Sequence, residues 1–265
     1  MSVAAGQDTI AAAFATSGKR AALMPYLMGG YPDLETSRAI GEAYADSGAD
    51  LVELGVPFSD PLADGPVIHA AGTAALAAGA TVHGVLEVGR ALADAVPVVL
   101  MCYANLVLAR GAERFAGDLA TRGISGLIVP DLPLEEAREA LAACDAAGIA
   151  LVALVAPTTP DERLAAIGRS ARGFVYTVSV TGTTGEREGL AGNLPAMLAR
   201  TKAHFGVPVA VGFGIGTPAA AGEAAAAGAD GVIVGSRLVR AAAEAADPAA
   251  AVRELVAGFA TALRR

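Results

Sequence analysis

Short apolar segments and longer amphipathic segments alternate along the whole chain. Eight of the apolar segments, rich in Val, Leu, Ile and Ala, are typical of buried β-strands. They are Ala22–Met28, Leu51–Leu54, Val98–Tyr103, Gly126–Val129, Ala150–Val155, Phe174–Ser179, Val207–Val211 and Gly231–Val234. The segments between them predict helices at Leu34–Ser47, Val67–Ala78, Val82–Ala93, Ala112–Arg122, Leu134–Ala147, Asp161–Ser170, Leu194–Thr201, Pro218–Ala227 and Ala249–Leu263.

Eight strand–helix units predict a closed parallel barrel. Glycine-containing helix ends, such as DSGAD and AAGIA, lead into several of the strands. The chain has 265 residues, close to the length of roughly 250 that one (β/α)8 barrel commonly occupies. We therefore expect an α/β fold, a single (β/α)8 TIM barrel over residues 1–265 with an extra N-terminal helix. An open doubly wound sheet is the alternative, because strand counts from one sequence err by about one or two.

The acidic balance of the chain argues against a nucleic-acid partner. The formal net charge is -8 and the sequence pI is about 4.9, and no block of Lys and Arg is present. Solubility is the simpler explanation of the acidity.

The termini and the cysteines favour a cytoplasmic protein. Cys102 and Cys144 lack the spacing of a disulfide framework or a zinc site, and the first 20 residues do not resemble a secretory signal. The uncharged run at 205–222 is as long as a short transmembrane span, but it contains five glycines and two prolines. A strand followed by a loop is expected there, and no membrane segment.

A carboxylate interrupts the second predicted strand. Side chains on a strand alternate between faces, so Leu51, Glu53 and Gly55 share one side. If Val52 and Leu54 pack under helices, Glu53 points into the barrel, where burial raises a carboxyl pKa and makes the group a usable proton donor and acceptor. A Glu paired with an Arg inside the barrel is the alternative.

Polar side chains recur where the predicted strands end, which is where (β/α)8 barrels carry their active groups. Asp60 and Asp64 lie on the Gly- and Pro-rich turn after the second strand, and are either acid/base candidates or turn-forming residues. Tyr103 ends the third strand, Tyr176 lies in the sixth, and Asp131 follows the fourth, where it either orients the loop or caps the following helix.

Two glycine turns late in the chain suit a phosphate group. GFGIGT, residues 212–217, follows the seventh strand, and VGSR, residues 234–237, follows the eighth and starts a helix. Backbone N–H groups and the positive end of a helix bind phosphate at this position in barrels. An ordinary tight loop is the alternative, and a Rossmann turn is disfavoured by spacing and position. The glycine-rich segment 181–193 is either a loop that closes over a ligand or a plain surface loop.

Other common catalytic groups are badly placed. The only lysines, Lys19 and Lys202, lie before a strand and beside a helix, which disfavours a Schiff base. His69, His83 and His204 lie in or beside predicted helices without metal-ligand spacing, so no metal is expected. Acid/base chemistry by carboxylates in a partly apolar mouth remains.

Seven segments, taken in order, resemble the α subunit family of tryptophan synthase: YLMGGYP, VELGVPFSDPLADGP, MCYANL, VPDLPLEE, TGTTGER, VGFGIGTP and VGSR. They span residues 26–237, and ELGVPFSDPLADGP is highly specific. The resemblance implies a lyase of L-tryptophan biosynthesis that cleaves indole-3-glycerol phosphate by a retro-aldol reaction into indole and glyceraldehyde 3-phosphate.

The resemblance also implies roles for single residues. Glu53 matches the glutamate that protonates the indole ring carbon and takes the proton from the glycerol hydroxyl, and Asp64 matches the aspartate that accepts the indole N–H bond. Substrate-binding positions are matched by Tyr26, Met101 and Tyr103 on the indole side, Tyr176 near the glutamate, Thr184 on the closing loop, and Gly185, Phe213, Gly214, Gly235 and Ser236 at the phosphate. Tyr26, Met101 and Cys102 stand where Phe, Leu and Met are common.

In this family the subunit pairs with a pyridoxal phosphate (PLP)-containing β subunit in an α2β2 heterotetramer, and the loop around Asp60 helps to form the contact. The resemblance therefore implies a β-subunit partner, with PLP in that partner and no cofactor in this chain. Two other hypotheses stay open: a phosphate-binding barrel isomerase of histidine or tryptophan biosynthesis, and a non-catalytic barrel that only activates another subunit. Assays of both substrates with the isolated chain separate them.

Overall fold

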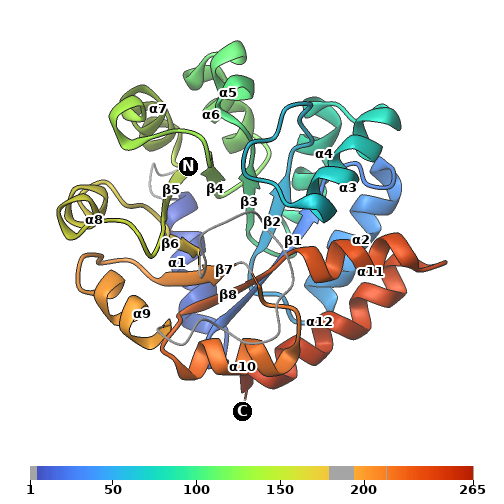
Figure 1. Ribbon diagram of the computed structural model, residues 1–265. Coiled ribbons are helices and arrows are strands. Elements are labelled where there is room, and N and C mark those ends of the chain that lie inside the picture. Colours follow the sequence, from blue (N-terminus) through green and yellow to red (C-terminus); the bar gives the residue numbers. More distant parts are fainter. Residues whose placement is uncertain (1–4, 179–193, 213, 265) are drawn as a thin grey trace.

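The chain folds into a closed barrel of eight parallel strands that follow one another in chain order, with helices around them (Figure 1). The computed structural model describes residues 5–178, 194–212 and 214–264. The strands are β1 (Ala22–Met28), β2 (Val52–Gly55), β3 (Val98–Met101), β4 (Gly126–Ile128), β5 (Ala150–Val155), β6 (Val175–Val178), β7 (Val209–Gly212) and β8 (Gly231–Val234). Pairing of β1 with both β2 and β8 closes the sheet, which confirms the barrel and rules out the open sheet.

The helices lie outside the barrel, apart from the first. They are α1 (Ala5–Thr16), α2 (Leu34–Asp46), α3 (Pro66–Ala77), α4 (Val82–Leu92), α5 (Ala104–Arg110), α6 (Ala112–Ala120), η1 (Leu134–Glu136), α7 (Arg138–Ala147), α8 (Asp161–Gly168), α9 (Leu194–Lys202), α10 (Pro218–Ala226), α11 (Ser236–Glu244) and α12 (Pro248–Arg264). No single helix among the described residues is long and apolar enough to cross a membrane. The pair α3 and α4 passes that test together, but is bent by 109°.

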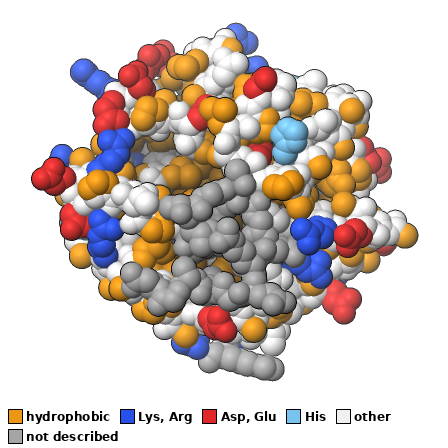
Figure 2. All heavy atoms as spheres, in the orientation of Figure 1, with side chains coloured by type: hydrophobic (Ala, Val, Ile, Leu, Met, Phe, Trp, Pro, Cys, Tyr) orange, Lys and Arg blue, Asp and Glu red, His pale blue; other side chains and the backbone are white. Residues whose placement is uncertain are grey.

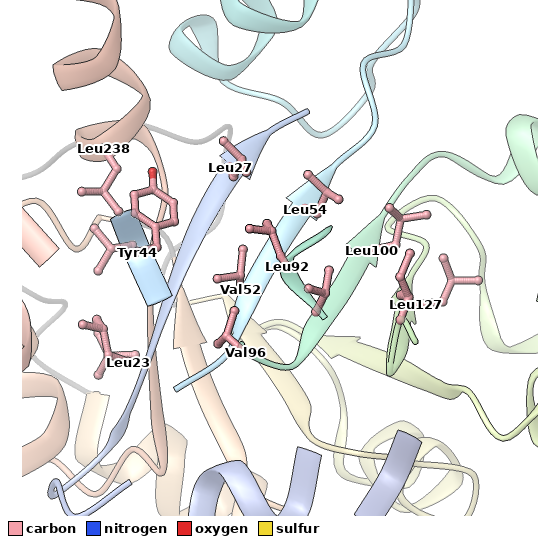
Figure 3. Close-up of a cluster of buried hydrophobic side chains, with 14 of the residues drawn as sticks. Leu23, Leu27, Tyr44, Val52, Leu54, Leu92, Val96, Leu100, Leu127 and Leu238 are labelled. Carbon is pink, nitrogen blue, oxygen red and sulfur yellow. The ribbon is translucent and has the colours of Figure 1, made fainter. Parts of the chain in front are cut away.

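The strands place alternate side chains on the two faces of the barrel wall. Outward-facing residues form a buried layer against the helices, in which Leu23, Val52, Leu54, Leu100 and Leu127 pack with residues such as Tyr44 and Leu92 (Figure 3). Inward-facing residues form a second cluster, which includes Met24, Leu51, Val99, Ile128, Phe174 and Ile233. The barrel interior is therefore a packed core toward the amino-terminal ends of the strands, with the site at their carboxyl-terminal ends.

The extra helix α1 closes the interior at the amino-terminal end of the strands. Ile10 is fully buried in the same cluster as Phe174, and the rings of Phe14 and Phe174 lie 5.9 Å apart. The Gly6 N–H donates to the Gly148 carbonyl at 2.9 Å, which fixes the start of α1 beside β5. Solvent access to the interior is thus left to the carboxyl-terminal end of the strands.

The amino-terminal end of the barrel carries the same ion-pair arrangement twice. Lys19 Nζ donates to Asp50 at 2.8 Å, and the second carboxylate oxygen of Asp50 accepts the Leu23 N–H. Lys202 Nζ likewise donates to Asp230 at 2.7 Å, and Asp230 accepts the Val209 N–H. Each aspartate joins the start of one strand to a lysine outside the sheet.

VGSR starts helix α11 at Ser236, as predicted. Apart from shifts at element ends, the structure departs from the predicted elements at two places. Helix α5 occupies residues between the third strand and α6 for which no element was predicted. The predicted helix Leu134–Ala147 is divided into η1 and α7. The uncharged run at 205–222 contains β7, a turn and the start of α10, so the expected strand followed by a loop is confirmed.

Candidate active site

The candidate side chains gather at the carboxyl-terminal end of the strands, the face turned to the viewer in Figures 1 and 2. Figure 2 shows hydrophobic side chains in a hollow on this face. Tyr26 on β1, Glu53 on β2, Met101 on β3 and Tyr176 on β6 all lie at inward-facing positions. Residues far apart in the sequence are thus brought together at the carboxyl-terminal end of the strands, the mouth of the barrel.

Glu53 is a buried carboxyl that has no charged partner among the described residues. The residue is 1 % exposed, and its Cα is paired with that of Tyr26 across the β1–β2 ladder. Its Oε1 atom has no hydrogen-bond partner within the described ranges, and none of the ion pairs found there includes Glu53. Burial raises the pKa of Glu53 to about 8, so the carboxyl is mostly protonated at neutral pH. No described Arg forms an ion pair with Glu53, so the alternative of an Arg-paired Glu53 is not supported by the described residues.

Asp64 is held by Tyr103, the residue that precedes helix α5 in the segment after β3. Tyr103 Oη donates to Asp64 Oδ1 at 2.9 Å and accepts the Ala63 N–H at 3.0 Å. The Tyr103 ring is stacked on Phe58, with 5.3 Å between centroids. Partial burial raises the pKa of Asp64, and the hydrogen bond from Tyr103 opposes that rise. One side chain therefore orders the loop after β2.

Tyr26 lies close to both carboxyls. Burial raises the pKa of Tyr26 well above its usual value, and the negative charges of Asp64 and Glu53 add to the rise. Its phenol occupies the space over Gly55, where a Cβ atom would overlap the hydroxyl. The Tyr176 hydroxyl occupies the space over Gly212 in the same way. Glycines at the ends of β2 and β7 thus make room for two tyrosines at the mouth.

The glycine turns after β7 and β8 lie at the same end. Gly214 has φ +86°, a conformation that favours glycine. Gly235 is the N-cap of α11 and Ser236 is its first residue, and no side-chain cap hydrogen bond is made here by the residues that the structure describes. The first N–H groups of α11 are therefore available to an anion. A Cβ atom at Gly235 would lie 3.7 Å from Tyr26 Cβ, so this turn borders Tyr26.

Two acidic loop residues have structural contacts. Asp131 accepts the Ala104 N–H at 2.8 Å and so caps α5, a helix that precedes it in the chain, rather than the helix that follows it. Asp60 is exposed and accepts a hydrogen bond from Ser59 Oγ at 2.5 Å. Thr184, Gly185 and Phe213 lie outside the described residues, as does the segment 181–193.

Met101 and Cys102 depart from the family pattern, and they lie on different faces of the barrel wall. Met101 is partly buried and contacts the inner clusters, whereas Cys102 is 1 % exposed and packs in the outer layer. Cys102 therefore faces away from any ligand in the barrel. Both lysines lie at the amino-terminal end of the strands, opposite Glu53, as their predicted positions implied. Within the described residues, no group of three His, Cys, Asp or Glu side chains is arranged to hold a metal ion.

Sequence reasoning missed the linkage from Tyr103 to the loop after β2. Tyr103 was placed on the wall of the pocket, and Phe58 was not singled out at all. No spacing signal connects them, because the contact joins residues on different strand–helix units. Gly55 and Gly212 were the available signal for large side chains at the mouth. Glycine inside a strand often marks a place where another group approaches the strand backbone closely.

A closed (β/α)8 barrel with a buried, unpaired carboxyl at its carboxyl-terminal mouth is the arrangement of barrel enzymes that use acid/base chemistry. The sequence model of the family described as "Tryptophan synthase alpha chain" matches residues 13–263. The chain belongs to the tryptophan synthase alpha chain family.

Individual relatives agree with this assignment. The chain is 51% identical over 229 residues to the tryptophan synthase alpha chain of Prochlorococcus marinus, covering 86% of this chain and 83% of that one. It is 48% identical over 222 residues to that of Methanosarcina mazei, covering 84% and 81%. Among solved structures, Mycobacterium tuberculosis tryptophan synthase has a TM-score of 0.90 at 41% identity, covering 97% of this chain and 98% of that one. The α2β2 complex of Pyrococcus furiosus has a TM-score of 0.84 at 36% identity, covering 91% and 97%.

Proposed function

We propose that the chain is the α subunit of a tryptophan synthase and cleaves indole-3-glycerol phosphate into indole and glyceraldehyde 3-phosphate. The observation that carries the proposal is Glu53, a buried carboxyl with a pKa of about 8 at the barrel mouth. Such a group donates a proton at neutral pH and accepts one in the following step. Family membership, the placement of Asp64 and the open N-terminus of α11 support the same reaction.

In the proposed mechanism, protonated Glu53 first adds its proton to C3 of the indole ring. The ring becomes an indolenine, and Asp64 accepts the N–H bond and stabilises the positive charge that develops on nitrogen. The Glu53 carboxylate then takes the proton of the glycerol hydroxyl. The carbonyl forms, the carbon–carbon bond breaks and its electrons return to the ring, so that indole leaves without any net change in protons.

The phosphate end and the indole end of the substrate are assigned to different parts of the barrel mouth. We assign the phosphate to the turns around Gly214, Gly235 and Ser236, with Gly185 and Phe213 completing it, and the indole to Tyr26, Met101, Tyr103 and Tyr176. Support comes from the inward positions of these side chains and from the uncapped start of α11. Thr184, which lies outside the described residues, is assigned a substrate-binding role. The assignment includes one barrel domain over residues 1–265, a cytoplasmic location and no cofactor bound to this chain.

Indole release by the purified chain tests the proposal. Glu53→Gln keeps the shape of the side chain but cannot relay a proton, so turnover is expected to fall to background while substrate still binds. Glu113→Gln, an exposed change on α6, is the matched control and is expected to leave turnover unchanged. Wild-type turnover by Glu53→Gln refutes the acid/base assignment. Conversion of an isomerase substrate instead supports the competing barrel hypothesis.

A β subunit with bound PLP is the proposed partner, and the carboxyl-terminal face is its proposed docking face. Leu62, beside Asp60 on the loop after β2, is 79 % exposed, and Leu108 on α5 is 66 % exposed. Large apolar side chains exposed on one face are typical of an interaction surface. Leu108→Ser is expected to weaken binding to the β subunit and its activation of indole release, whereas Leu76→Ser on α3 is not. Equal activation of both variants would contradict this docking face.

A further inference from the structure

Helices α7 and α8 face each other across a groove outside strand β5, in the region where Figure 1 draws them as neighbouring helices. The groove has a volume of about 860 Å³. Its α7 wall is made by side chains that recur every three or four residues and so share one helix face, namely Ala137, Arg138, Leu141, Ala142 and Asp145. The opposite wall is made by Thr159, Arg163, Ile167 and Ser170.

The floor of the groove is the outer face of β5, which its helices leave partly open. The outward-facing residues Leu151 and Ala153 are only partly buried and line the groove. The corresponding outward-facing residues Leu54, Leu100 and Val232 on other strands are fully buried. An apolar surface that is covered elsewhere around the barrel is thus accessible here.

Two bidentate ion pairs join the α7 side of the groove to the α8 side. Arg163 on α8 donates to both carboxylate oxygens of Glu135 in η1, at 2.7 and 3.0 Å. Arg172, after α8, donates to both oxygens of Asp145 on α7, at 3.0 Å each. Arg–carboxylate pairs of this geometry fix orientation, so they hold the two walls apart at a defined distance.

Among the described residues that line the groove, one cation has no described ion-pair partner. Asp145 is engaged by Arg172, and Asp131 by the Ala104 N–H. Arg138 lies exposed at the rim and forms no ion pair with any described residue. The groove therefore offers an apolar floor and a guanidinium at its edge, which together suit a ligand with an apolar body and one negative charge.

We propose that this groove is a binding site for a small amphipathic anion, an aromatic or aliphatic molecule with one carboxylate or sulfonate. The volume lies within the range of about 300–1,000 Å³ that is usual for small-molecule sites. The inner end of the groove is lined by Leu154 and Val178, which face the barrel interior, so a bound ligand lies next to the catalytic mouth. The site is independent of which reaction that mouth catalyses.

Anilinonaphthalene sulfonate is a suitable probe, because it has the expected chemistry and fluoresces when it leaves water. Ala142→Trp fills the groove from an exposed wall position, and Ala146→Trp places the same side chain at an exposed position of α7 outside the lining. We expect saturable binding by the wild type and by Ala146→Trp, and at least tenfold weaker binding by Ala142→Trp. Arg138→Gln is expected to weaken binding about threefold to fivefold, whereas Arg114→Gln on α6 is not.

Three results would overturn the proposal. Equal binding by Ala142→Trp and Ala146→Trp places the probe elsewhere on the chain. Displacement of the probe by indole-3-glycerol phosphate from the Glu53→Gln variant places it in the catalytic mouth. Self-association of the wild type that Ala142→Trp abolishes makes the groove a contact between two copies of the chain. The groove variants are measured without turnover, so their outcome does not depend on the proposed reaction.

Discussion

Tyr103 and Asp64 are 39 residues apart in the chain, and the phenol of one donates a hydrogen bond of 2.9 Å to the carboxylate of the other. The same phenol accepts the Ala63 N–H, and the ring stacks on Phe58. The loop after β2 is therefore attached at three points to one side chain, that of Tyr103 between β3 and α5. The position of Asp64 at the mouth depends on this attachment.

Removal of the Tyr103 hydroxyl is expected to slow the reaction. Tyr103→Phe keeps the ring on Phe58 but leaves Asp64 without its donor, and a hydrogen bond to a charged group is worth about 1.5–3 kcal/mol. We expect indole release to fall by about tenfold to a hundredfold in kcat/KM. Tyr31→Phe, on the loop after β1, is the control.

Combination with Asp64→Asn separates positioning from a general loss of structure. If Tyr103 acts through Asp64, Tyr103→Phe has little further effect in the Asp64→Asn background. Fully additive losses in the double variant would show that the two residues act independently.

Glu53 gives the stability of the fold a pH dependence. Its pKa is about 8 in the folded chain against an ordinary value of 4.5, so between these values the unfolded chain releases a proton that the folded chain keeps. The free energy of unfolding therefore falls as pH rises through this window, by roughly 3 kcal/mol from pH 5 to pH 8. Glu53→Gln is neutral at every pH and is expected to lack this loss. Denaturant titrations of both proteins at several pH values measure it, and parallel curves would contradict the raised pKa of Glu53 in the folded chain.

The buried ion pair at the other end of the barrel is expected to matter for stability. The side chains of Lys19 and Asp50 are 4% and 10% exposed, so Lys19→Ala leaves a poorly solvated carboxylate without its cation. We expect a loss of about 3–5 kcal/mol in the free energy of unfolding. The exposed pair of Arg38 and Glu42 is the comparison, and Arg38→Ala is expected to cost less than about 1 kcal/mol. Similar losses in the two variants would mean that burial of the Lys19 pair has no energetic effect.

Gly55 is expected to tolerate no larger side chain while Tyr26 is present. A Cβ atom at this position overlaps the Tyr26 hydroxyl and lies 2.6 Å from its Cζ atom, so Gly55→Ala is expected to cost about 1–3 kcal/mol of stability. Tyr26→Leu lacks both of those atoms, and in its background the cost of Gly55→Ala is expected to shrink. Thermal or denaturant unfolding of the four proteins in this cycle measures the coupling, and its absence would place the clash elsewhere.

The sequence alone predicts most of the barrel because its signals are local. Short apolar runs separated by helical segments located all eight strands, and parity placed Glu53 inside. The N-terminal helix is also confirmed, although its plugging of the interior through Ile10 and Phe14 depends on contacts with β6 that no local pattern contains.

Features that depend on distant contacts were not predictable. Helix α5 begins at Ala104 because Asp131 from another loop caps it, and nothing in the segment itself specifies that cap. The same holds for the hydrogen bond between Tyr103 and Asp64, and for the incomplete cover of β5 by α7 and α8. Each of these arises where two strand–helix units meet, whereas periodicity describes one unit at a time.

The pairing of both lysines with aspartates at the amino-terminal end has a practical consequence for attaching the protein to a surface. Lys19 is nearly inaccessible, whereas the side chain of Lys202 is 38% exposed. Among side-chain amines, amine-reactive linkers are therefore directed to Lys202. Coupling to beads or sensor chips through this residue holds the chain by the end away from the mouth, so that substrate and partner approach an unobstructed face.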